Sequence, residues 1–81
     1  MNEYLLEKQK TVIGRAKNAD IRIRGLFAPR VRVEIVRTGD DYVLRSNGRG
    51  RIRINGEETR EKTLEREDLI AIGAEEFVFK E

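Results

Sequence analysis

The sequence predicts an all-β protein, a β-sandwich built from two sheets of short, mostly antiparallel strands. Three segments alternate polar and apolar residues with a period of two: residues 20–24 (DIRIR), 30–35 (RVRVEI) and 51–54 (RIRI). This period is typical of strands with one buried face, and none of the three segments repeats apolar residues at the helical spacing. Gly, Asn and Asp are frequent between them and favour tight turns. Many short strands joined by tight turns indicate a sandwich or a barrel.

The remaining strands are expected on the same grounds. Residues 4–8 (YLLEK) supply one N-terminal strand, and residues 11–14 (TVIG) supply an apolar strand that ends at a glycine. Alternation recurs at residues 42–44, 70–72 and 77–79. The apolar residues at strand-period positions are expected to be buried between the two sheets. They are Ile13, Ile21, Ile23, Val33, Ile35, Leu44, Ile52, Ile54, Ile70, Ile72, Phe77 and Phe79.

A hairpin is predicted around Asn55-Gly56. Both residues adopt positive φ more readily than others, as a two-residue type I′ turn requires. Residues 51–55 (RIRIN) and 57–60 (EETR) would then be its two arms. Arg51 and Arg53 fall on the outer face of the first arm, and residues 46–50 (SNGRG) are expected to form the loop that leads into it.

Size and composition indicate one domain over residues 1–81. The chain has 81 residues and no cysteine, so it has neither a disulfide framework nor a thiolate metal site. No apolar run approaches the roughly 18 residues of a membrane span, and the N-terminus lacks the pattern of a secretory signal. We therefore expect a soluble, cytoplasmic domain with no membrane insertion and no cofactor.

The charges are distributed unevenly along the chain. The net charge is +2, yet residues 15–53 carry eleven basic and four acidic side chains, and residues 54–81 carry four and nine. One interpretation is that part of the surface attracts anions. The other is that the two halves neutralise each other across neighbouring strands.

An enzymatic function is not expected. Without His or Cys, imidazole bases, the usual nucleophilic triads and the usual zinc sites are missing. The carboxylates fall mostly in runs that are typical of solvated turns, such as residues 57–58 and 65–68. The sequence GRGR at 48–51 lacks the third glycine of a dinucleotide fingerprint and has no helix after it. Neither catalytic nor metal-ligating residues are predicted.

The order of the motifs resembles the forkhead-associated (FHA) domain. The family framework runs I-G-R, D-I-x-[IVL], L, V-N-G and L-x-x-G-D-x-I-x-I-G with a terminal F-x-F. This sequence has Ile13-Gly14-Arg15, Asp20-Ile21-Arg22-Ile23, Leu44, Ile54-Asn55-Gly56 and residues 64–79, with Glu67 in place of the motif's glycine. The match covers roughly residues 11 to 80. It implies a two-sheet sandwich whose loops at one end bind phosphothreonine in a partner protein.

The resemblance carries over to the binding residues only in part. Arg15 matches the arginine that steadies the site, and Arg30 matches a basic residue that helps to hold the phosphate. Pro29 stands at the family's phosphate-binding serine and Arg32 at its histidine. Gly50-Arg51 stands at the family's Asn-Gly, which leaves Asn47 as a substitute for the asparagine that bonds the peptide backbone. These losses should weaken the usual binding mode by roughly 2–4 kcal/mol.

Basic side chains from the same loops can compensate, because arginine binds phosphate oxygens through two hydrogen bonds at once. The resemblance thus implies a noncatalytic module that binds phosphorylated Thr or Ser segments with little selectivity between the two. The candidate phosphopeptide-binding residues are Arg15, Lys17, Arg30, Asn47, Arg49 and Arg51.

Two other functions stay open. A degenerate FHA domain can assemble with an unphosphorylated partner, in which case the arginines are merely solvated loop residues. A small β-barrel can also bind single-stranded nucleic acid through a basic groove with aromatic platforms. Nucleic acid is the less favoured partner, because Phe27 is the only aromatic residue that the strand pattern places in a loop.

Overall fold

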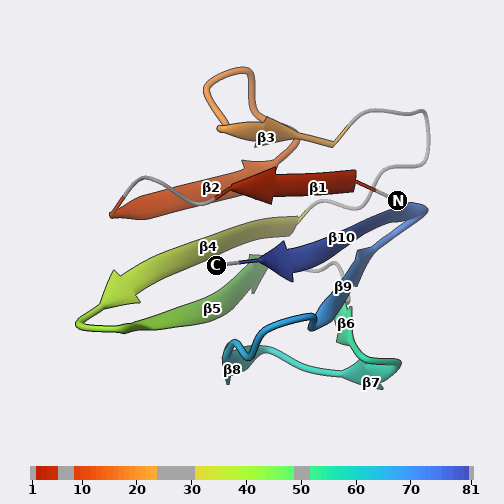
Figure 1. The fold of residues 1–81 in the computed structure, drawn as a ribbon. Helices are drawn as coiled ribbons and strands as arrows, with labels where there is room; N and C mark the ends of the chain where they lie inside the picture. Colours follow the sequence, from red (N-terminus) through yellow and green to blue (C-terminus); the bar gives the residue numbers. More distant parts are fainter. Residues whose placement is uncertain (1, 6–8, 24–30, 49–51, 81) are drawn as a thin grey trace.

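The computed structural model describes residues 2–5, 9–23, 31–48 and 52–80, which form ten strands in two five-stranded sheets (Figure 1). The β10 sheet has the order β1 (Asn2–Leu5), β10 (Glu75–Lys80), β9 (Leu69–Ile72), β6 (Ile52–Ile54) and β7 (Glu57–Glu58). The β4 sheet has the order β3 (Ile21–Arg22), β2 (Lys10–Gly14), β4 (Val31–Thr38), β5 (Asp41–Gly48) and β8 (Glu61–Thr63). Within these residues only β1–β10 and β2–β3 pair in parallel. The described part of the chain contains no helix able to cross a membrane.

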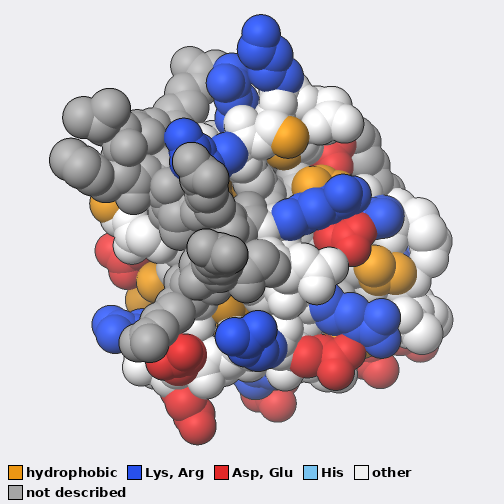
Figure 2. Space-filling view, turned by 180° about the vertical axis from the view of Figure 1, so that it is seen from behind, with side chains coloured by type: hydrophobic (Ala, Val, Ile, Leu, Met, Phe, Trp, Pro, Cys, Tyr) orange, Lys and Arg blue, Asp and Glu red, His pale blue; other side chains and the backbone are white. Residues whose placement is uncertain are grey.

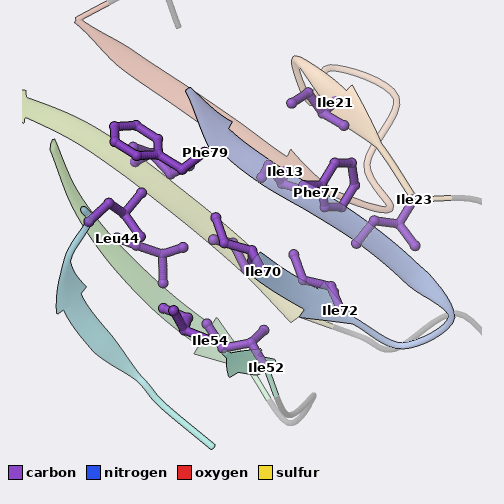
Figure 3. Packing of buried hydrophobic residues seen from close by; sticks show 13 residues of the cluster. Ile13, Ile21, Ile23, Leu44, Ile52, Ile54, Ile70, Ile72, Phe77 and Phe79 are labelled. Carbon is purple, nitrogen blue, oxygen red and sulfur yellow. The ribbon is translucent and has the colours of Figure 1, made fainter. Parts of the chain in front are cut away.

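The core lies between the two sheets, and the strand period predicted its members. All twelve residues expected to be buried are buried, and Leu64 joins them. Figure 3 shows side chains of both sheets in this cluster, among them Ile70 and Phe77 of the β10 sheet and Ile13 and Leu44 of the β4 sheet. Each aliphatic side chain removed from water here contributes about 1.5–3 kcal/mol.

The predicted hairpin is present. Ile54 pairs with Glu57, and the two turn residues Asn55 and Gly56 have φ angles of 55° and 84°. Two positive φ angles are what a type I′ turn requires. The second arm is shorter than expected, since β7 spans only Glu57–Glu58. Residues 61–63 instead form β8, which pairs with β5 in the other sheet.

The expectation that residues 65–68 form a solvated turn is wrong for Asp68. Glu65, Arg66 and Glu67 are exposed, as expected of a solvated turn, but Asp68 is buried. Its carboxylate accepts hydrogen bonds from Asn55 Nδ2 at 2.8 Å, Lys62 Nζ at 2.7 Å and the Glu65 N–H at 2.8 Å. Since Lys62 lies on β8 and Asn55 at the end of β6, this Asp68 network links the two sheets.

The strand β5 also differs from the expectation. Residues 46–48 were predicted to be loop, yet they continue β5 and pair with the start of β4, with Asn47 opposite Arg32 and Gly48 opposite Val31. The cause is nonlocal, because β4 offers backbone partners to residues whose own propensity for strands is low. This extension brings Asn47 into the sheet beside the candidate site.

Candidate functional site

One end of the β4 sheet carries a row of aligned residues on four neighbouring strands. Arg22 of β3 pairs with Gly14 of β2, Gly14 pairs with Arg32 of β4, and Arg32 pairs with Asn47 of β5. Their sequence neighbours Ile13, Ile21, Ile23 and Val33 are buried, so by the strand alternation this row faces outward. Arg22, Arg32 and Asn47 are exposed, and the row contains no acidic residue.

Arg15 and Lys17 lie just beyond this row, in the loop that joins β2 to β3. The loop is held by its own backbone and by one carboxylate. The Val12 N–H donates to Asp20 Oδ2 at 2.8 Å, the Ala19 N–H donates to the Ala16 carbonyl at 3.1 Å, and the Ile23 N–H donates to the Gly14 carbonyl at 2.8 Å. Both cationic side chains are exposed. The loop therefore presents them on a backbone that is already ordered.

Arg22 is a member of this site that the sequence did not predict. Its Nε–H donates to the carbonyl of Arg15 at 3.3 Å, which directs the side chain of Arg22 toward the loop end. The alternation places Arg22 on an outer face, but only the parallel register of β2 and β3 reveals that it lies next to Gly14. No local signal in the sequence gives that register.

Arg32 contacts an acidic neighbour that is already neutralised. Glu34 Oε1 lies 2.6 Å from Lys10 Nζ and 3.5 Å from Arg32 Nη2. The hydrogen bond from Lys10 is the main reason that the pKa of Glu34 is below its usual value, and the charges of Lys10, Arg32 and Arg45 add to it against a smaller effect of burial. Glu34 therefore stays ionised at neutral pH with Lys10 as its near partner, and the Arg32 side chain, 59% exposed, is held only at the limit of hydrogen bonding.

The predicted site residues divide into two groups. The structure brings Arg15, Lys17 and Asn47 to the same end of the β4 sheet, although Asn47 lies in a strand rather than in a loop. Arg30, Arg49 and Arg51 lie outside the described residues. The strands that flank these segments are described: β4 begins at Val31 and β5 ends at Gly48, which are paired to each other, and β6 begins at Ile52.

Basic side chains gather at this level of the molecule. Figure 2 shows Lys and Arg at the top, the height at which Figure 1 places the β2–β3 loop, and most of the visible acidic side chains lie lower. Other Lys and Arg side chains lie lower in the same view, beside acidic ones, and Arg45 pairs with Glu61 across neighbouring strands.

The described residues contain no group of three side chains suited to hold a metal ion. A hollow of about 20 Å³ between β2, β3, β4, β9 and β10 is lined only by apolar side chains, among them Ile13 and Phe77. This is room for about one water molecule, without the polar groups that orient a substrate.

The described part of the chain is thus a two-layer β-sandwich that presents cationic side chains at one end of the β4 sheet. The comparisons with known proteins give the family. The family model of the FHA domain matches residues 11–73, so the chain belongs to the FHA domain family.

Two solved structures share the fold. The FHA domain of FhaA, crystallised in complex with the intracellular domain of Rv3910, is similar with a TM-score of 0.75 and 24% sequence identity, over 90% of this chain and 81% of that one. The FHA structure of Rv0020c has a TM-score of 0.76 and 23% identity, over 95% of this chain and 78% of that one. No curated protein sequence matches the chain.

Proposed function

We propose that this FHA domain is a noncatalytic module, a single domain over residues 1–81 acting in the cytoplasm, that binds a phosphorylated Thr or Ser segment of a partner protein. The observation that carries the proposal is the cationic end of the β4 sheet, where Arg15 and Lys17 extend beyond an outward row that has no acidic residue. A phosphate with about two negative charges is the side-chain group that such an end favours most strongly.

The similarity to FhaA supports a protein as the partner, since that FHA domain was crystallised with the intracellular domain of another protein. Arg30, Arg49 and Arg51 extend the site in this proposal. They would replace the missing serine and asparagine contacts with charge-assisted ones, and Asn47 would bond the peptide backbone. Cations that surround a phosphate without a hydroxyl-sized pocket discriminate little between side chains, so phosphoserine and phosphothreonine peptides should bind within a few fold of each other.

The test compares matched phosphorylated and unmodified peptides by calorimetry or fluorescence anisotropy. Wild-type protein should prefer the phosphorylated form. Replacing Arg30 and Arg49 together by Ala should remove about 2–4 kcal/mol of binding free energy if each makes one charge-assisted contact. Equal binding of both peptide forms, unchanged in the double variant, would contradict the phosphodependent function.

A second comparison tests the location of the site. Arg15→Ala should weaken phosphopeptide binding, whereas Arg53→Ala should leave it unchanged, because Arg53 is an exposed residue of β6 in the other sheet. Equal losses for the two substitutions would show that binding does not occur at the loop end.

Phosphate-independent assembly is the second candidate function. The observation in its favour is the outer face of the β10 sheet, where the partly exposed Leu69 and Val78 are paired and Ala71 lies beside them. A partner docked on this face would be insensitive to phosphate and to the Arg30/Arg49 double variant. Nucleic acid gains no comparable support, because Phe77 and Phe79 are buried and Tyr42 packs edge-on against Phe79.

A further inference from the structure

We propose that Arg22 and Arg32 form a second anion subsite on the outer face of the β4 sheet, which binds the carboxylate of an Asp or Glu near the phosphorylated residue in the same partner segment. This inference rests on the proposed phosphopeptide function and specifies what the partner must carry besides the phosphate.

The first support is geometric. Arg22 and Arg32 are the outward neighbours of Gly14 on either side, and adjacent strands lie about 4.8 Å apart, so the two Cα atoms are separated by about 10 Å. Because the residue between them is glycine, strand β2 itself places no side chain between the two arginines. Gly14 itself is buried, so an acid would contact the guanidinium groups above the strand and not its backbone.

The second support is that neither arginine has a short ion pair with another described residue. In the described part of the chain, Arg22 donates to the carbonyl of Arg15, which is a neutral acceptor. Arg32 has only the 3.5 Å contact with Glu34, whose oxygen Lys10 approaches to 2.6 Å. An incoming carboxylate would therefore not have to displace a strong ion pair.

The neighbouring row supplies a contrast within the same sheet. Arg45 of β5 pairs with Glu34 on one side and with Glu61 on the other, and its Nε lies 2.6 Å from Glu61 Oε1. The side chain of Arg45 is 69% exposed and that of Arg32 is 59% exposed, but Arg45 already has an ion pair with Glu61 on the neighbouring strand. Arg45 is therefore the matched control, an exposed arginine whose charge is already paired.

The third support is the distance along the chain. Arg15 follows Gly14 directly, so its Cα atom lies about 3.8 Å from that of Gly14, the residue between Arg22 and Arg32 in the row. An extended peptide advances by a similar distance per residue. A phosphate near Arg15 would therefore place a residue within a few positions of the phosphoresidue over the two arginines, and a carboxylate is the anionic group that unmodified residues supply there.

The test uses nine-residue peptides with a central phosphothreonine, Ala and Ser flanks, and one Glu moved through each flanking position. Wild-type protein should bind one or two of these peptides about fivefold to tenfold more tightly than the peptide without Glu, the effect of one exposed charge-assisted contact. Arg22→Gln and Arg32→Gln should each reduce that gain, while Arg45→Gln should keep it. Thermal unfolding of the variants checks that the fold is intact.

An unphosphorylated peptide with Glu at the preferred position, or at each position if none is preferred, separates this inference from the proposed function. At millimolar concentration it should shift the backbone amide signals of Gly14, Arg22 and Arg32 in NMR spectra. The subsite is refuted if neither peptide series responds to Glu, or if Arg45→Gln abolishes the response as fully as Arg32→Gln. Binding that ignores phosphate while the Glu peptide still shifts these signals would overturn the proposed function and retain the subsite.

Discussion

Replacing Asp68 by asparagine is expected to destabilise the domain by about 2–4 kcal/mol. Only 4% of Asp68 is exposed, and its two carboxylate oxygens accept hydrogen bonds from Asn55, Lys62 and the Glu65 N–H. Asparagine has nearly the same shape, so the substitution changes the hydrogen bonding and the charge while leaving the packing in place.

The magnitude follows from the three donors. One amide oxygen can face Lys62 and the Glu65 N–H, but these bonds then lose charge assistance, about 1 kcal/mol in total. The new amide N–H₂ group faces the N–H₂ group of Asn55, which cannot turn over because its oxygen accepts the Leu69 N–H at 2.9 Å. Leaving that donor pair unsatisfied costs about 1–3 kcal/mol more. Lys62 is one-third exposed and can reach water, which keeps the loss below that of a fully buried broken ion pair.

The effect should depend on pH in a defined direction. Burial raises the pKa of Asp68, but the hydrogen bonds from the Glu65 N–H, Lys62 and Asn55 outweigh it and hold the pKa below its usual value. A carboxyl whose pKa is lower in the folded state stabilises the protein above its unfolded pKa of about 3.9, and this stability is lost as the pH falls through the folded value. The difference between wild type and Asp68→Asn should be complete at pH 7 and shrink below about pH 4.

Urea unfolding followed by circular dichroism at pH 7 and near pH 3 measures this difference. The matched control is Glu61→Gln, which removes the ion pair between Arg45 and Glu61 on the same strand pair. Both of those side chains are more than half exposed, so the control should change the free energy of unfolding by less than about 1 kcal/mol. The reasoning fails if the two variants are equally stable at pH 7, or if the Asp68→Asn deficit is the same at both pH values.

Two further substitutions test the backbone and the core. Glu67 has a φ of 71°, where a side chain costs about 1–2 kcal/mol, and its exposed contact with Lys80 adds little, so Glu67→Gly should stabilise the domain by about 0.5–1 kcal/mol after the entropy of glycine is counted. A lowered melting temperature would contradict that explanation. Ile72 is fully buried, and Ile72→Ala should cost about 2–5 kcal/mol, measured by the same urea unfolding. A loss below about 1 kcal/mol would mean that the two sheets do not pack as tightly as its burial indicates.

The core residues could be predicted from the sequence because the residue pattern within each strand is enough to identify them. The alternation of polar and apolar residues along a single strand indicates which of its faces is buried, and this does not depend on which strands it pairs with. The hairpin at Asn55-Gly56 was equally accessible, because its φ angles follow from the two residue types. Both features needed no knowledge of distant parts of the chain.

Strand β8 and the end of β5 could not be predicted in this way. Residues 61–63 (EKT) contain no apolar side chain, and they form a strand because β5 pairs with them and Lys62 reaches Asp68. Asp68 itself was hidden in a charged run, since its partners Asn55 and Lys62 stand 13 and 6 residues away in the sequence. Arg22 was missed for the same reason, as its place beside Gly14 depends on the register of two parallel strands.

The arrangement separates the residues that stabilise the sandwich from those that are proposed to bind. The Asp68 network adjoins the row of Leu44, which pairs with Lys62, and Asn47 lies three residues further along β5, about 10 Å away. At the binding end the cations are exposed, and their described contacts are with a carbonyl and a shared carboxylate, so they add little to stability. Substitutions of Arg22 or Arg32 should therefore leave the scaffold in place, because the Asp68 network that links the two sheets does not involve them. Binding and unfolding should therefore respond to different substitutions.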